Sequence, residues 1–280
     1  RLPLTGHRRA TLHRPALRRL CGWESLGDVP SEATFSRAFG VFARDGRPQQ
    51  IHEALIKTHY GDKLAGHVSR DATAIHARER AEAKPKAPPK PGRGKRGRRR
   101  KDDPPAPPPD PTRLQRQLQS GLKGNLAGLP KVCDWGCKKN SHDKIECWRG
   151  YKAHLDVVDG DIPVSFILSS ASLHDSQAAI PLAQMTAGRI ANLYDLADAA
   201  YDAKEIREMS ARLGHVAIID HNARRGEKIE FSPAEARRYN ERTAVERVNS
   251  HLHDEHGGRH VRVRGPVKVA AHLAFGLLVI

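Results

Sequence analysis

A strongly basic segment divides the chain and limits what can fold. Residues 84–101 carry ten Lys and Arg side chains and no acid, and residues 82–112 hold no apolar side chain larger than Ala. Such a stretch cannot bury enough apolar surface to offset the entropy lost on ordering. We therefore expect a disordered basic insertion or linker within residues 82–131, with folded structure on either side.

The net charge points to a polyanionic partner. The chain of 280 residues has a formal net charge of +16, much of it from residues 84–101, so that the remaining body is only mildly basic. Neutralising phosphates releases counterions, which favours nucleic acid as the partner. The basic segment is either a solvated insertion or a clamp that follows DNA phosphates through cations such as Arg96, Arg98, Arg99 and Arg100.

The first part of the chain has a helical pattern. Ser31 can cap a helix in which Phe35, Phe39 and Phe42 recur at helical spacing, and a second helix is expected over residues 49–58. Two short helices joined by a turn are either a helix-turn-helix DNA reader or an ordinary packing unit. We assign residues 1–65 to a helical DNA-binding region and residues 66–280 to a second, larger domain.

The second domain alternates strands and helices. Strand patterns occur around Asp71, on both sides of a turn at residues 159–161, before Asp198 and in "HVAIIDH", and helices are expected between the later strands and over residues 233–252. This order predicts an α/β fold with a mixed sheet flanked by helices. The apolar run at residues 267–280 is shorter than the roughly 20 residues that span a bilayer, so we expect a core helix and no membrane segment.

The cysteines indicate a cytoplasmic protein. Four cysteines in a chain of this length do not make a disulfide scaffold, and no signal segment opens the sequence. We expect them to be reduced. A zinc site is the alternative, with the four ligands Cys133, Cys137, His142 and Cys147.

Three acids lie where regular structure can project them: Asp71, Asp198 and Glu246. On the last long helix, Glu246 shares one face, within a sector of roughly 60°, with three other residues, which are Tyr239, Arg242 and His253. That face is either a solvated surface with an Arg242–Glu246 ion pair or part of a site.

Three other acids have alternative roles. Asp195 is a rival to Asp198, but strand alternation puts the two on opposite faces, so that only one can reach a common site. Asp175 and Asp202 are explained as helix caps.

Three motifs resemble the DDE transposases of bacterial insertion sequences. "YNERTAVERVNSHLH" is similar to the family's Tyr-x2-Arg-x3-Glu-x6-Lys signature, "ADAAYDA" to its strand end with the second acid, and "SRDATAI" to the segment with the first. The resemblance extends over residues 30–280, apart from the basic segment. The family's lysine falls on His253, which is shorter than lysine and mostly neutral near pH 7.

The resemblance implies a fold, an activity and a set of partners. The fold would be RNase H-like, and the activity cutting and joining of DNA strands, with two Mg²⁺ or Mn²⁺ ions held by Asp71, Asp198 and Glu246. Tyr239, Arg242 and His253 would contact double-stranded DNA at the element's terminal inverted repeats and at the target, in a homodimer associated with the bacterial nucleoid. An inactive or domesticated DNA-binding relative and an RNase H-like nuclease without strand transfer are the alternatives.

Overall fold

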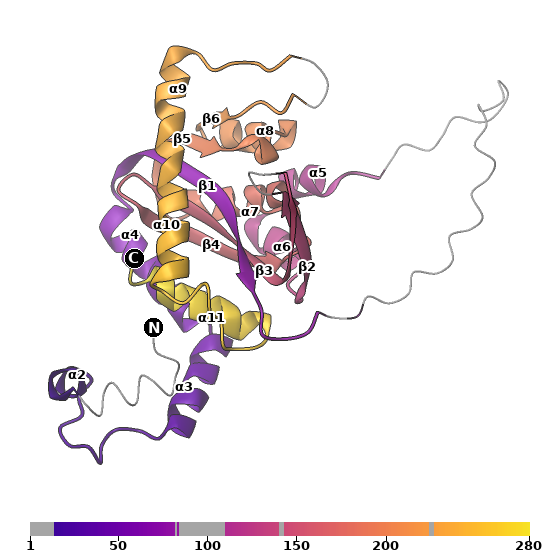
Figure 1. Ribbon diagram of the computed structural model, residues 1–280. Helices are drawn as coiled ribbons and strands as arrows, with labels where there is room; N and C mark the ends of the chain where they lie inside the picture. The colour runs from indigo at the N-terminus through magenta and orange to yellow at the C-terminus, as the bar shows by residue number, and fades with distance from the viewer. Residues whose placement is uncertain (1–13, 82, 84–109, 140–142, 224–226) are drawn as a thin grey trace.

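The computed structural model describes residues 14–81, 83, 110–139, 143–223 and 227–280 (Figure 1). The helices are α2 Pro15–Leu20, α3 Glu32–Arg44, α4 Arg47–Tyr60, α5 Arg113–Leu118, α6 Leu122–Ala127, α7 Ala179–Ala187, α8 Lys204–Arg212, α9 Pro233–Tyr239, α10 Thr243–Asp254 and α11 Pro266–Leu277. The 3₁₀ turns are η1 Asp175–Ala178, η2 Ala199–Tyr201 and η3 Asn240–Arg242. The strands are β1 Leu64–His76, β2 Asp134–Lys139, β3 Ile145–Val158, β4 Ile162–Ser170, β5 Ala191–Ala197 and β6 Val216–Ile219.

The strands form one six-stranded mixed sheet. Its order is β2-β3-β1-β5-β6, and β4 also pairs with β3. β3 runs antiparallel to β1, β2 and β4, whereas β1, β5 and β6 are parallel. The expected mixed sheet flanked by helices is therefore confirmed, and β1 lies at its centre.

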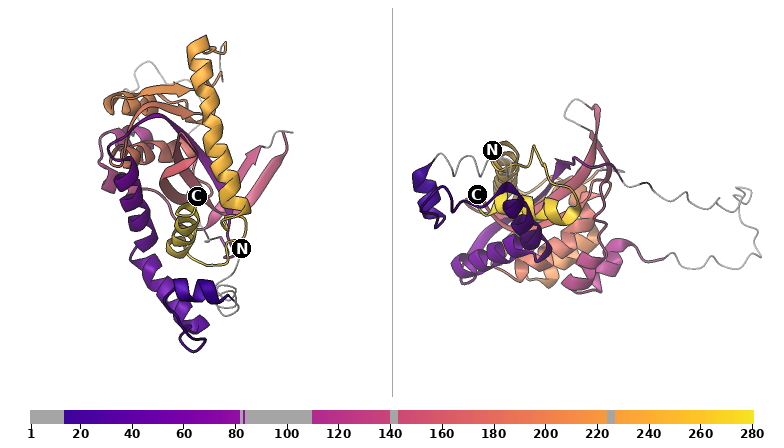
Figure 2. Two further views of the ribbon diagram at one scale, coloured as in Figure 1. Left: turned by 90° about the vertical axis from the view of Figure 1, so that its left-hand side faces the viewer. Right: turned by 90° about the horizontal axis from the view of Figure 1, so that it is seen from below.

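Helices cover both faces of the sheet. In Figures 1 and 2, α10 and α11 lie against one face, and α7 and α8 lie against the other. The first layer closes a core in which Val245, Val248 and Leu252 of α10 meet Leu155 of β3 and Leu273 of α11. Burying each such side chain stabilises the fold by about 1.5–3 kcal/mol.

The β3–β4 hairpin forms where the sequence predicts it. Gly160 and Asp161 both adopt positive φ, at 85° and 64°, in the connection between the paired residues Val158 and Ile162. Glycine reaches this left-handed region freely, and aspartate is among the few other residues that tolerate it. The Asp-Gly-Asp turn thus reverses the chain tightly.

The first helices pack on the sheet layer. Ser31 caps α3 by accepting a hydrogen bond from the Thr34 amide, as predicted. Ile56 of α4 shares a hydrophobic cluster with Val68 of β1, and His52 of α4 lies 2.8 Å from the Pro163 carbonyl oxygen. Part of the region assigned to DNA binding therefore contributes to the core.

Part of the expected linker is helical. α5 and α6 lie within residues 82–131, and Thr112 opens α5 with a capping box. Leu118 of α5 is buried in the cluster under α7 and α8. The basic segment itself, with Arg96, Arg98, Arg99 and Arg100, lies outside the described residues.

The cysteines differ from expectation. Cys137 and Cys147 are direct partners across β2 and β3 and form a disulfide, so the prediction of reduced thiols is wrong for this pair. Cys21 and Cys133 are free. The disulfide uses two of the three thiols of the alternative zinc site. The fourth ligand of that site, His142, lies outside the described residues.

The apolar C-terminal run forms α11, the predicted core helix, in which Val269 and Leu273 are fully buried. Among the described residues, no helix has both the length and the apolar character required to cross a bilayer.

A buried ion pair joins the two central strands. Arg70 of β1 donates from Nε and Nη2 to the two carboxylate oxygens of Asp156 on β3, both at 2.7 Å. The Thr186 hydroxyl of α7 donates to the same carboxylate at 2.6 Å. Arg70 is only 3% exposed and Asp156 is fully buried. The two parallel hydrogen bonds from the planar Arg70 guanidinium to the Asp156 carboxylate fix both side chains and the strands that carry them.

We predict that Arg70→Met lowers the free energy of unfolding by about 3–5 kcal/mol, because Asp156 would remain buried without its counter-charge. Urea unfolding followed by circular dichroism measures the loss. The double variant Arg70→Met/Asp156→Leu should recover much of it, and Arg44→Met, at a side chain that is 74% exposed, is the control. An equal loss in the single and double variants would contradict this account.

Candidate active site

The parallel pairing of β1 and β5 puts Asp71 beside Asp198. Arg70 is the register partner of Ala197, so the next residue on each strand is one of the two acids. Ser69, two residues before Asp71 on the same face of β1, donates its hydroxyl to the Glu241 carbonyl just before α10. Both acids therefore lie on the α10 side of the sheet, and Asp198 also accepts a hydrogen bond from the Ala200 amide at 2.9 Å.

Burial raises the pKa values of both carboxylates. Burial, followed by the charges of Asp198 and Asp175, raises the pKa of Asp71 to about 7, against a backbone hydrogen bond from Ala72 and the charge of Arg242. Burial also raises the pKa of Asp198, and Asp175 and Asp220 add to the effect. Two adjacent acids with raised pKa values favour a cation between them.

Glu246 lies outside this pair. Its side chain is 51% exposed and accepts a hydrogen bond from Arg242 Nη2 at 2.7 Å. It lines an open hollow of about 330 Å³ on the outer side of α10, together with Thr243, Arg247, Ser250 and His251. Over the described part of the chain, no group of three His, Cys, Asp or Glu residues is arranged to hold a metal ion.

Arg242 links the two parts of the candidate site. Its guanidinium is bonded to Glu246 and lies 5.5 Å from the centre of the Tyr239 ring. Its charge also acts on both Asp71 and Asp198. Tyr239 is held against Phe231, with ring centres 4.8 Å apart. Arg242 is thus the cation that partly balances the acids.

His253 contacts the protein itself. Its Nε2 lies 2.8 Å from the Thr73 hydroxyl on β1, in a half-buried position. Burial, with a contribution from Arg259, lowers the pKa of His253. The imidazole is therefore neutral near pH 7, as the sequence suggested, and in this structure it bonds to a strand residue.

Asp195 belongs to a different network on the opposite face. It accepts hydrogen bonds from Ser210 at 2.6 Å and from Asn192 at 3.0 Å, and His215 Nδ1 lies 3.3 Å away. Asp195 is 4% exposed. The alternation along β5 therefore separates Asp195 from Asp198 as predicted, and Asp195 ties β5 to α8.

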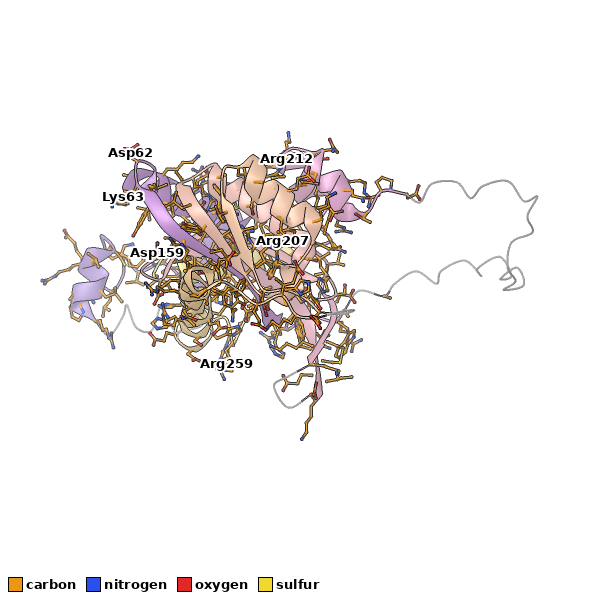
Figure 3. All side chains as sticks on the ribbon, turned by 90° about the horizontal axis from the view of Figure 1, so that it is seen from above. Asp62, Lys63, Asp159, Arg207, Arg212 and Arg259 are labelled. Carbon is orange, nitrogen blue, oxygen red and sulfur yellow. A yellow bond between two sulfur atoms is a disulfide. The ribbon has the colours of Figure 1, made fainter. Side chains whose placement is uncertain are left out.

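The two predicted helix caps are wrong. Asp175 accepts a hydrogen bond from Lys152 Nζ at 2.7 Å, and its charge reaches Asp71 and Asp198. α8 starts after Ala203 without a side-chain cap, and Asp202 instead pairs with Arg207 of α8, the helix labelled at Arg207 and Arg212 in Figure 3. Capping patterns alone could not reveal these partners. Lys152 is distant from Asp175 in the sequence, and the pairing of Asp202 with Arg207 depends on the geometry of the loop before α8.

Asn249 is a site residue that the sequence analysis missed. Its Nδ2 donates to Asp71 Oδ2 at 3.2 Å. The only sequence clue is its position three residues after Glu246, a spacing that makes two side chains neighbours on a helix surface.

We predict that Asp195→Asn lowers the free energy of unfolding by about 1–3 kcal/mol, because Ser210 and Asn192 donate to different carboxylate oxygens and an amide keeps only one acceptor oxygen. Asp198→Asn is the matched control at the end of the same strand. It should leave stability unchanged or raise it, since burial already disfavours the charged form of Asp198. Thermal unfolding of both variants at pH 7 tests the difference. A larger loss for Asp198→Asn would reverse the two assignments.

The comparison with protein families identifies the family of the chain. A family model described as Transposase DDE domain matches residues 110–280, which include Asp198 and Glu246 and begin after Asp71. A comparison with curated proteins finds no match. The family match covers more than half of the chain and confirms the resemblance found in the motifs. The chain therefore belongs to the family of transposase DDE domains.

Proposed function

We propose that this protein is an insertion-sequence transposase that cuts DNA strands and joins them to a target by metal-assisted transesterification. The observation that carries the proposal is the pair of acids, Asp71 and Asp198, held side by side with raised pKa values on the α10 side of the sheet. From the family we expect a DNA substrate and divalent metal ions.

The donor set fits Mg²⁺ or Mn²⁺. These ions prefer carboxylate oxygens and retain waters that phosphate oxygens can replace. Two such ions would supply an activated water or 3′-hydroxyl and stabilise the leaving oxygen of the phosphodiester. Asp71, Asp198 and Glu246 would hold them. Excess negative charge at the first two acids supports this role, and Glu246 would contribute once it leaves its ion pair with Arg242.

Arg242 is suited to bind DNA. Its guanidinium can form two parallel hydrogen bonds to a phosphate, which is a stronger match than its single bond to Glu246. If Arg242 turned to a phosphate, it would release Glu246 from their ion pair. Tyr239 would support the Arg242 side chain through its ring. The basic segment with Arg96, Arg98, Arg99 and Arg100 would follow the DNA backbone, and a homodimer would hold two element ends.

A strand-transfer assay tests the function. The full chain is incubated with DNA that carries the element's terminal repeats, a target plasmid and Mg²⁺ or Mn²⁺, with EDTA as the control. Joined product supports the proposal. Nicks without joining would indicate a nuclease, and bound but intact DNA would indicate an inactive DNA-binding relative, an alternative consistent with the exposed position of Glu246.

We predict that Asp71→Asn, Asp198→Asn and Glu246→Gln each reduce cleavage by at least about 10³-fold, because each removes a carboxylate that would hold a metal ion. Binding of the terminal repeats, measured by fluorescence anisotropy, should change by less than threefold, roughly 0.6 kcal/mol. Glu241→Gln, at a variable and exposed position within the signature, is the control. Cleavage at the wild-type rate by any of the three variants would remove that residue from the site.

A further inference from the structure

Asn249 is out of place among the buried residues of α10. The helix buries five residues, and four of them are apolar: Ala244, Val245, Val248 and Leu252. Asn249 is the fifth and is 8% exposed. Burying an amide costs free energy unless its hydrogen bonds are made. Packing alone would favour an apolar residue here.

The hydrogen bonding of Asn249 is incomplete. Its Nδ2 donates to Asp71, whereas its buried Oδ1 has no partner. An unsatisfied buried acceptor reduces stability. Asn249 therefore lowers the stability of the fold while it bonds to a candidate catalytic acid. Residues that are unfavourable for folding are typically found at functional sites.

The position of Asn249 follows from how α10 lies along β1. Three alternate β1 residues bond to this helix region in order: Ser69 to the Glu241 carbonyl, Asp71 to Asn249, and Thr73 to His253. Glu246, which the signature identifies as the acid of this helix, faces Arg242 instead. Asn249 is therefore the α10 side chain that holds Asp71 in this structure.

We propose that Asn249 is a positioning residue that fixes the Asp71 carboxylate in the orientation needed to receive a divalent metal ion. This inference rests on the proposed function. A hydrogen bond to one oxygen of a ligating carboxylate limits its rotation and leaves its other lone pairs available, as outer partners do at metal sites. Without the amide, Asp71 would still lie at the site but would sample more orientations.

The test compares Mn²⁺ affinity and stability in the full chain. Asn249→Leu keeps the branched shape of the side chain but has no donor and no orphan acceptor, and Ser250→Ala, at the next and exposed position, is the matched control. We expect the Kd of Asn249→Leu for Mn²⁺, measured by calorimetry, to rise at least about 10-fold. Its unfolding midpoint without metal should stay the same or rise, because the unpaired buried oxygen is gone. Ser250→Ala should change neither.

A second readout separates positioning from direct ligation. Raising the Mn²⁺ concentration should restore cleavage by Asn249→Leu toward the wild-type rate, because its acids are intact, and should not restore Asp71→Asn. The KM for DNA should not change. Failure of rescue in Asn249→Leu would overturn a positioning role.

Other outcomes are equally decisive. Wild-type Mn²⁺ affinity in Asn249→Leu, or weaker binding accompanied by a lower unfolding midpoint, would overturn the inference while leaving the proposed function intact. Wild-type protein that binds no Mn²⁺ would overturn both. Wild-type protein that binds Mn²⁺ but does not cleave DNA would count against the transposase function alone, since the affinity comparison still tests Asn249.

Discussion

The buried pair of Arg70 and Asp156 determines which face of β1 serves the site. Successive side chains on a strand point to opposite faces, and a slip of one residue exchanges them all. Because Arg70 is fixed to Asp156 on the α7 side, Asp71 must point toward α10. One register of β1 thus places Arg70 in the core on one face and Asp71 at the candidate site on the other. The pairing of β1 with β5 adds Asp198 on the same face as Asp71.

Charge balance explains why the three acids are not equivalent. Asp71 and Asp198 are close, partly buried and short of positive charge, and Asp175 adds to the deficit although Lys152 pairs with it. Arg242 is shared between them and Glu246, which remains accessible to solvent. The Arg242 guanidinium therefore connects the inner acids to the outer one, and an anion that draws it away would remove positive charge from all three.

Local sequence patterns predicted much of the fold and only part of the site. Alternation along β5 correctly separated Asp195 from Asp198, because strand periodicity depends on the backbone alone. The helical expectation for residues 233–252 was confirmed, but the 3₁₀ turn η3 between α9 and α10 alters the phase that a regular helix would give to Tyr239. Neither the Cys137–Cys147 disulfide nor the bonds of Asp175, Asn249 and His253 could be predicted, since each depends on which elements pack together.

Helix α11 gives the part of the chain after Glu246 an importance that the three acids alone do not suggest. α11 contains no residue of the signature. Its residues Val269, Leu273 and Leu277 nevertheless pack in one hydrophobic core with the buried side of α10. A frameshift or stop codon between His253 and α11 would spare every signature residue and still remove the helix that packs against the one carrying Glu246. Intact motifs in a shortened copy of such a gene are therefore poor proof of a working enzyme.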